Sequence, residues 1–303
     1  MKAAPAKWSR PLIGEKVAVS AAFAALCTAA LAQVAANAPG VAGGDDPEYL
    51  HQLRVGLRRL LSAMRSFRPL LKRERAKAVA RPLREAMQVF GAARDWDVFI
   101  VTLQRAQASP ALRSSAERQR AGLAEQARAH AGSAEFQSEQ EAVLRWLEDA
   151  PWRSSARPDE PLIGYARAAL SRGHRKLHAR ASDIDWRDRE RRHAVRIALK
   201  RLRYGCDFFA GLFPARAVTP FLRRLGQLQD SLGELNDIAV AHALLAELAG
   251  NGDDVRRWLA RRERVLIASL ATDWAAFQGL APYWQPAARR GRRRKPRASA
   301  SRA

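Results

Sequence analysis

The sequence is poor in the residues on which several common classes of protein depend. It has only two cysteines, Cys27 and Cys206, which lie far apart and form no CxxC motif. This argues against a disulfide framework or a cysteine zinc site and favours a reduced, cytoplasmic location. The chain also lacks a G-x-x-x-x-G-K-[ST] phosphate loop, a G-x-S-x-G nucleophile elbow and an H-E-x-x-H motif. The signatures of the commonest nucleotide, ester and zinc chemistries are therefore missing.

Acidic residues are scarce as well. The 303 residues include 53 Lys+Arg but only 30 Asp+Glu, which gives a formal net charge of +23. Residues 286–303 hold 8 of these cations and no acid, so the rest of the chain keeps 23 − 8 = +15. With no apolar residues able to build a core, this basic tail is predicted to be disordered. A body with so large a positive charge is expected to bind an anion.

Patterns typical of β-strands are also few. Apolar residues recur at spacings of three and four along segments rich in Ala, Leu, Arg and Glu, which predicts an all-α protein. Breaks are predicted near 38–47, 109–110, 151–161, 213–214, 250–253 and 279–286. The uncharged stretch 17–38 loosely imitates a secretory signal, but we favour an alanine-rich core helix. No other segment reaches the length of a membrane span, so no membrane partner is expected.

The two sides of the chain repeat one another. The segment HQLRVGLRRL at 51–60 matches HAVRIALKRL at 193–202, an offset of 142 residues. Further matches at this offset are Phe67 and Phe209, Gly91 and Gly233, and Asp95 and Asp237. A match that keeps register over this length indicates an internal duplication, with two pseudo-symmetric helical bundles. We expect halves at about 14–150 and 161–285, joined by a linker at 151–160.

Each repeated segment separates an apolar face from a basic stripe when it is placed on a helix at about 100° per residue. The stripes carry His51, Arg54, Arg58 and Arg65 in the first half and His193, Arg196, Lys200 and Arg203 in the second. Like charges at this spacing repel, so their alignment indicates an anionic ligand that offsets the repulsion. Arginine, lysine and histidine together suit phosphate oxygens. The alternative is an ordinary solvated surface.

The start of the first segment also favours an anion. Gly43-Gly44-Asp45-Asp46-Pro47 offers an N-cap aspartate followed by a proline in the first turn. His51 then lies within about two turns of the positive end of the helix.

These segments, with FGAARDWD at 90–97 and LGELND at 232–237, resemble the CHAD domain, the conserved histidine α-helical domain. The resemblance spans roughly residues 14–285. It implies two helical bundles around a basic central groove or pore that binds inorganic polyphosphate, and in some members a location at polyphosphate granules. By motif position it implies the ligands His51, Arg54, Arg58, Arg59, His193, Arg196, Lys200, Arg201 and Arg203. The first copy departs from the family pattern at Leu61, where the second has Arg203, and Arg65 is expected to compensate.

Other residues leave alternatives open. Asp95, Asp97 and Asp237 could act as acid/base groups or metal ligands, but we favour ion pairs that hold arginines in place. His174 and His178 have the spacing of a metal-binding pair, yet their basic neighbours favour a solvated face. We expect non-catalytic polyphosphate binding, with no cofactor or metal. The alternatives are nucleic-acid binding and, with less support, a metal-dependent phosphohydrolase. The sequence does not indicate an oligomeric state.

Overall fold

The computed structural model describes residues 4–285 except 45, 150 and 249–251. In this part of the chain the regular structure consists of α-helices and two short 3-10 helices, without a β-strand. The predicted all-α class is therefore confirmed. The predicted basic tail, 286–303, lies outside the described residues.

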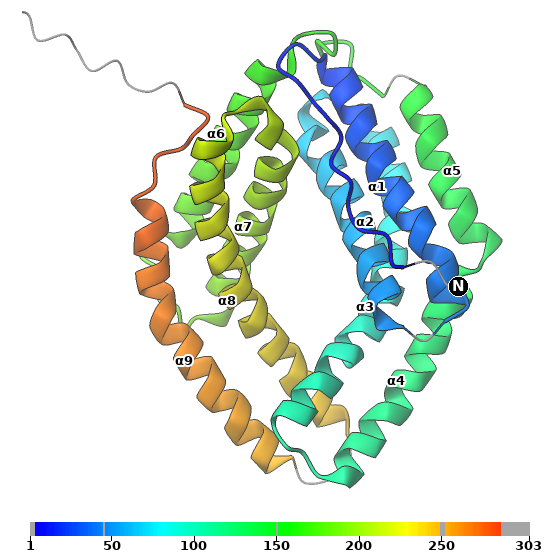
Figure 1. Cartoon of the computed structure of the whole chain (residues 1–303), viewed down its shortest axis with the longest axis vertical. Helices are drawn as coiled ribbons and strands as arrows, with labels where there is room; N and C mark the ends of the chain where they lie inside the picture. Colours follow the sequence, from blue (N-terminus) through cyan, green and yellow to red (C-terminus); the bar gives the residue numbers. More distant parts are fainter. Residues whose placement is uncertain (1–3, 45, 150, 249–251, 286–303) are drawn as a thin grey trace, which may run out of the picture.

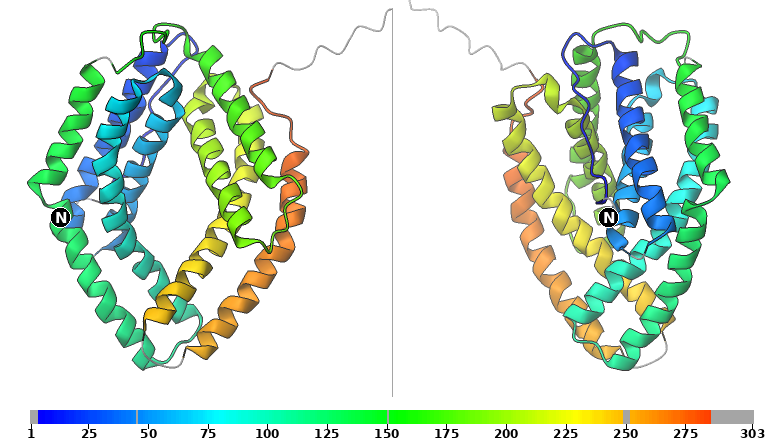
Figure 2. Two further views of the ribbon diagram at one scale, coloured as in Figure 1. Left: turned by 180° about the vertical axis from the view of Figure 1, so that it is seen from behind. Right: turned by 45° about the vertical axis from the view of Figure 1, so that its right-hand side comes forward.

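Two helical bundles lie side by side (Figures 1 and 2). The first contains α1 (Val19–Ala42), α2 (Pro47–Ser66), η1 (Arg68–Leu70), α3 (Arg73–Arg105), α4 (Pro110–Ala131) and α5 (Ala134–Glu148). The second contains α6 (Leu162–Ala181), α7 (Arg189–Phe209), η2 (Ala210–Leu212), α8 (Ala215–Glu247) and α9 (Asp253–Gln278). The bundles touch where α2 packs on α7 and α3 packs on α8.

Helix boundaries repeat at the same offset as the sequence. α2 and α7 begin 189 − 47 = 142 residues apart, and α3 and α8, of 33 residues each, begin 215 − 73 = 142 apart. The capping aspartates also correspond: Asp46 accepts a hydrogen bond from the Glu48 N–H, and Asp188 accepts one from the Arg191 N–H. The predicted cap at Asp46 is thus present, and each α2-type helix starts at a capped, electropositive end. A common origin of the halves stays a prediction.

The core is continuous between the bundles. Phe67 and Phe209, which correspond at the offset, are fully buried, and their ring centroids lie 6.0 Å apart in an edge-to-face contact. Phe67 also packs on Phe23 of α1 and on Tyr165 of α6. Aromatic pairs of this geometry add to the stabilisation that burial provides. The line between the two halves therefore runs through a shared apolar core beside the facing helices α2 and α7.

Helix α1 is the most apolar element. By length and hydropathy it could cross a membrane, a test that core helices of soluble proteins also pass. Here Phe23, Leu26 and Ala30 are fully buried, and α1 packs closely along α2. Gly56 of α2 permits this approach, because a Cβ atom there would lie 2.8 Å from Val34 Cγ2. The packing agrees with the interpretation of residues 17–38 as a core helix.

The segment that joins the bundles is held at both ends. Ala18 and Pro161 form an isolated antiparallel bridge, as do Leu71 and Trp152. Both bridges link the connection to the first bundle, over the end at which α5 finishes and α6 begins (Figure 1). The connection thus fixes where the second bundle starts.

Candidate functional site

Four cations from the two repeated helices come together between the bundles. Arg54 and Arg58 belong to α2, and Arg196 and Lys200 belong to α7. The charge on Arg58 lowers the pKa of each of the other three. The four side chains are therefore close enough to repel one another, and they are termed the central cluster below.

Loss of hydration is the main cause of the perturbed pKa values in this cluster. Burial, followed by the charge on Arg58, lowers the pKa of Arg54 to about 10. Burial, followed by the charge on Arg196, lowers the pKa of Lys200 to about 7. Arg54 is thus charged at neutral pH, whereas Lys200 is close to half protonated. An anion at this place would relieve the repulsion and favour the charged lysine.

Two carboxylates from α3 and α8 partly offset the cations. Asp95 interacts favourably with Arg54, Arg58 and Arg196. Asp237 interacts favourably with Arg196 and Lys200. Burial raises the pKa of Asp95 despite these cations. Four cations against two carboxylates leave a positive excess at the centre.

Corresponding residues of the two halves meet at the centre. Arg58 lies near Lys200, and Asp95 lies near Asp237, closely enough to shift a pKa in each pair. Both pairs differ by 142 residues, as do the contacting rings of Phe67 and Phe209. The central cluster therefore brings together residues from corresponding positions of the two repeated segments, and a ligand there would meet similar chemistry from both sides.

Some nitrogen atoms of the cluster lack a partner. Arg54 Nη1 and Arg196 Nε are buried and have no hydrogen-bond acceptor in the described part of the chain. The Arg54 guanidinium packs closely on Gly91 of α3, because a Cβ atom at this glycine would lie only 2.9 Å from Arg54 Nη1. A buried donor without an acceptor is costly. Phosphate oxygens would supply acceptors of the right charge.

The histidines occupy different environments. His51 is half-buried on α2, and burial, followed by the charge on Arg94, lowers its pKa. It is therefore neutral at pH 7 and can donate one hydrogen bond. His193 is solvent-exposed on α7. The two predicted histidine ligands thus correspond in sequence but not in surroundings.

Arg59 lies apart from the central cluster, although the motif pairs it with the other ligands. Its guanidinium stands over the ring of Trp8, 4.8 Å from the ring centroid, and Arg59 Nη1 donates to Gln33 Oε1 at 3.4 Å. Asp207 and Arg203 are charged neighbours on α7. The Arg203 side chain packs against Gly226 of α8, where a Cβ atom would lie 2.7 Å from Arg203 Nη1.

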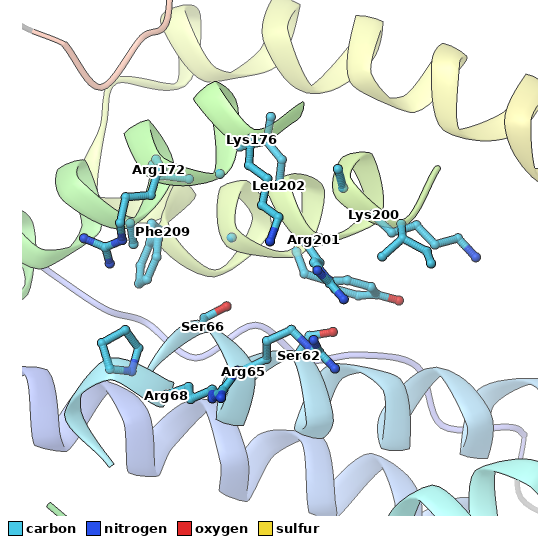
Figure 3. A pocket seen from close by; sticks show the side chains of 18 of the residues that line it. Ser62, Arg65, Ser66, Arg68, Arg172, Lys176, Lys200, Arg201, Leu202 and Phe209 are labelled. Carbon is cyan, nitrogen blue, oxygen red and sulfur yellow. The ribbon is translucent and has the colours of Figure 1, made fainter. Parts of the chain in front are cut away.

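A cavity of about 490 Å³ opens beside the central cluster between α2, α6 and α7 (Figure 3). It is termed the lateral cavity. Arg58 and Lys200 of the cluster line one part of it, together with the predicted ligands Arg65 and Arg201. Its lining includes seven cations and no carboxylate: Arg58, Arg65, Arg68, Arg172, Lys176, Lys200 and Arg201. Arg68, Arg172 and Lys176 were not predicted, because they lie on η1 and α6, outside the repeated motif.

The third aspartate of the acidic motif has a structural role. Asp97 Oδ1 accepts a hydrogen bond from Arg120 Nε at 2.8 Å, and Asp97 Oδ2 lies 3.7 Å from Arg94 Nη1. This pairing is the one favoured from the sequence. Within the described residues, no group of three or more His, Cys, Asp or Glu side chains is placed to hold a metal ion.

The expectation of a solvated face at His174 and His178 is wrong. Both rings are half-buried, and their Nε2 atoms lie 3.0 Å apart. His178 packs on Trp274 and His174 packs on Trp284. Burial lowers the pKa of His174 to about 4. The pair contributes to an aromatic core that α6 shares with the C-terminal part of the chain.

Comparisons with known proteins agree with the arrangement of helices. A family model described as the CHAD domain matches residues 25–246. A crystal structure of the CHAD domain from the plant Ricinus communis is similar with a TM-score of 0.76 and 29% identity, covering 92% of this chain and 98% of that one. PptA from Streptomyces chartreusis has a TM-score of 0.62 and 14% identity, covering 86% and 98%, a likeness of fold alone. No curated protein gives a significant match.

Proposed function

The chain belongs to the CHAD-domain family, and we propose that it binds inorganic polyphosphate at the central cluster without catalysing a reaction on it. The observation that supports this most is the convergence of four cations from both halves, with buried arginine donors that lack acceptors. Such a set favours a strongly charged ligand with many oxygen acceptors.

A polymer suits the length of the basic stripe better than a compact anion. From His51 to Arg65 the stripe on α2 covers fifteen residues, and the fourteen steps between its ends give roughly 21 Å at 1.5 Å per residue. A single phosphate could meet only a few of these side chains. A linear polyphosphate could contact the stripe on α2 and its counterpart on α7 with the same repeating group.

Nucleic acid is the main alternative. It would produce the same strong dependence on salt, because counterion release depends on phosphate contacts. Binding of single strands usually adds aromatic side chains on which bases stack. Neither basic stripe contains an aromatic residue, although Tyr204, on the wall of the lateral cavity, follows Arg203 of the second stripe in the sequence. This supports polyphosphate over nucleic acid.

A phosphohydrolase is less well supported. The acidic candidate Asp97 is engaged with Arg94 and Arg120, and Asp95 lies among arginines. The test is phosphate release from polyphosphate with Mg²⁺ or Mn²⁺. Release that His51→Ala abolishes would overturn the non-catalytic proposal. If binding alone is the function, we further propose that it brings the protein to polyphosphate granules in the cytoplasm, which a fluorescent fusion would reveal.

The proposed site is tested by removing one arginine from each half. We expect Arg54→Ala with Arg196→Ala to weaken binding of long-chain polyphosphate at least tenfold at moderate salt. The slope of log affinity against log salt should flatten by about one phosphate contact per cation removed. The measurement is a pair of binding isotherms at about 50 and 200 mM salt.

The matched control for this variant is Arg113→Ala with Arg118→Ala. These arginines are exposed on α4, and the control changes the net charge by the same amount. An equal loss of affinity in both variants would mean that polyphosphate responds only to overall charge. That outcome would contradict the site.

A further inference from the structure

The N-terminal segment, residues 4–14, lies in a groove lined by Arg59, apart from the central cluster. It runs as an extended stretch along the seam between the bundles (Figure 1). Asn37 of α1 exchanges two hydrogen bonds with the Ala6 backbone, at 3.0 and 2.9 Å. Trp8 lies under the guanidinium of Arg59 on α2, and Arg10 Nη2 lies 3.9 Å from Asp207 Oδ1 on α7. The groove is thus formed by α1, α2 and α7 and holds an extended peptide.

The lateral cavity is the counterpart of that groove in the other half of the molecule. At the 142-residue offset, Arg59 corresponds to Arg201 and Asp207 corresponds to Arg65, and both counterparts line the cavity. The elements correspond as well: α1 with α6, α2 with α7, and α7 with α2. The fold therefore contains this kind of groove twice. In the first half the chain's own N-terminal segment occupies it.

The segment that precedes the second bundle does not enter the lateral cavity. The stretch 151–161 comes before α6, as residues 4–14 come before α1, but it pairs with Leu71 and Ala18 at the end of the molecule. Its Trp152 packs on Phe23 of the first bundle. The described part of the chain therefore supplies no peptide to the lateral cavity.

The filled groove and the lateral cavity carry opposite charges at one pair of corresponding positions, Asp207 and Arg65. Asp207 faces Arg10 in the filled groove, whereas its counterpart Arg65 stands among six other cations with no carboxylate in the lining. The floor is apolar, with Leu170, Leu202 and Phe209. A peptide that fits must therefore be acidic and carry an apolar or aromatic residue. Residues 286–303 of the chain have the wrong charge, because they hold eight cations and no acid.

We propose that the lateral cavity docks an extended acidic peptide segment of a partner protein. One aromatic side chain of the segment lies on the apolar floor against Arg201, as Trp8 lies against Arg59. Its carboxylates pair with the basic rim at Arg68 and Lys176. A cavity of about 490 Å³ lies in the size range of sites for small ligands and accommodates a few side chains rather than a folded domain.

The probe is a fluorescein-labelled peptide of alternating Glu and Ser with one central Trp, titrated with the full chain by fluorescence anisotropy. We expect it to bind, and its Gln-for-Glu analogue to bind at least tenfold more weakly. Replacing the Trp by Ala should also weaken binding, by about threefold or more, because the cation–π and apolar contacts are lost. Equal binding of the Glu and Gln peptides would overturn the proposal.

The location of peptide binding is tested with the double variant Arg68→Glu and Lys176→Glu, termed the rim variant. Both side chains are exposed on the rim and are not predicted polyphosphate ligands. We expect at least a tenfold loss of peptide affinity. The matched control, Arg113→Glu with Arg118→Glu on α4, changes the net charge equally. It should alter the affinity for the peptide by less than about twofold. Equal losses in both variants would overturn the proposal.

Polyphosphate binding by the same variants separates this proposal from the proposed function. Relative to its control, the rim variant should keep its affinity for long-chain polyphosphate within about threefold. If polyphosphate affinity falls as far as peptide affinity, the cavity belongs to the path of the polymer, and the peptide proposal is wrong. If the chain binds the peptide but no polyphosphate, the proposed function fails and docking stands.

Discussion

Arg58 on α2 and Lys200 on α7 hold corresponding positions and lie close together, but they differ in charge near neutral pH. An arginine keeps its proton throughout the physiological range, whereas burial and the charge on Arg196 lower the pKa of Lys200 to about 7. The first half therefore offers a permanent cation where the second offers one that titrates. At this pair of positions, only the residue of the second half changes its charge near pH 7.

The surroundings of the motif arginines differ in the same way. Arg59 is covered by Trp8, whereas its counterpart Arg201 is exposed on the lateral cavity. Arg203 has Leu61 as its counterpart. The starts of α2 and α7, their capping aspartates and the equal lengths of α3 and α8 thus agree between the halves, while the charged groups around the centre differ.

Of the changes that test the difference between Arg58 and Lys200, a change of pH should have the largest effect on polyphosphate affinity. The polyanion favours charged Lys200, so binding takes up a proton once free Lys200 is neutral. Affinity for polyphosphate should therefore fall as pH rises above about 7, by up to tenfold per pH unit. Below about pH 6 the free lysine already carries its proton and adds no further dependence. Binding isotherms between pH 6 and 9 measure this.

Lys200→Arg is the variant that removes this asymmetry. With an arginine in both halves, the fall above pH 7 should disappear, because arginine keeps its proton. The surrounding groups Arg54, Arg58, Arg196 and Asp237 stay the same in both proteins. A fall of equal size in wild type and variant would show that another group titrates.

A smaller effect should follow from the two corresponding glycines of α3 and α8. Gly91→Ala places a Cβ atom 2.9 Å from Arg54 Nη1, whereas a Cβ atom at Gly233 meets nothing within 4 Å. Both changes should raise the free energy of unfolding by about 0.5–1 kcal/mol, because alanine favours a helix. Only Gly91→Ala should weaken polyphosphate binding, by a few fold, since it displaces the Arg54 guanidinium. Chemical denaturation and binding isotherms on both variants test this. Similar affinities would show that the position of Arg54 is unimportant.

The smallest effect should come from uncovering Arg59. Trp8→Ala removes a cation–π contact at 4.8 Å and should lower the free energy of unfolding by about 0.5–1 kcal/mol. Polyphosphate affinity should rise by less than about threefold, because exposed Arg59 still lies apart from the central cluster. A loss of affinity would place Trp8 in the binding site. Denaturant titration and a binding isotherm decide this.

Much of the fold followed from periodicity. The three- and four-residue spacing predicted helices, and these are present. The offset between the repeated segments paired Phe67 with Phe209, and both side chains are fully buried and in contact with each other. The break expected near 38–47 is narrower, because α1 continues past Pro39 to Ala42. Pro39 is tolerated in the last turn of a helix already fixed by packing on α2.

The site was predictable where it lies on one helix and less so where it depends on tertiary contacts. Arg54 and Arg58 share the stripe on α2, Arg196 and Lys200 share the stripe on α7, and the four side chains do converge. The cover over Arg59 and the contribution of Arg172 and Lys176 to the cavity depend on how α6 and the N-terminal segment pack, which no local pattern encodes. The burial of His174 and His178 could not be predicted for the same reason, because the aromatic rings that pack on them come from distant parts of the chain.

Competition between phosphate polymers separates polyphosphate binding from nucleic-acid binding. Long-chain polyphosphate bound to the full chain is challenged with single-stranded RNA and with DNA at equal phosphate concentration and two salt concentrations. We expect polyphosphate to stay bound at both salt concentrations, because the basic stripes on α2 and α7 offer cations for phosphates but no aromatic residues on which bases could stack. Displacement of polyphosphate by RNA or DNA would contradict it and identify the protein as a nucleic-acid binder.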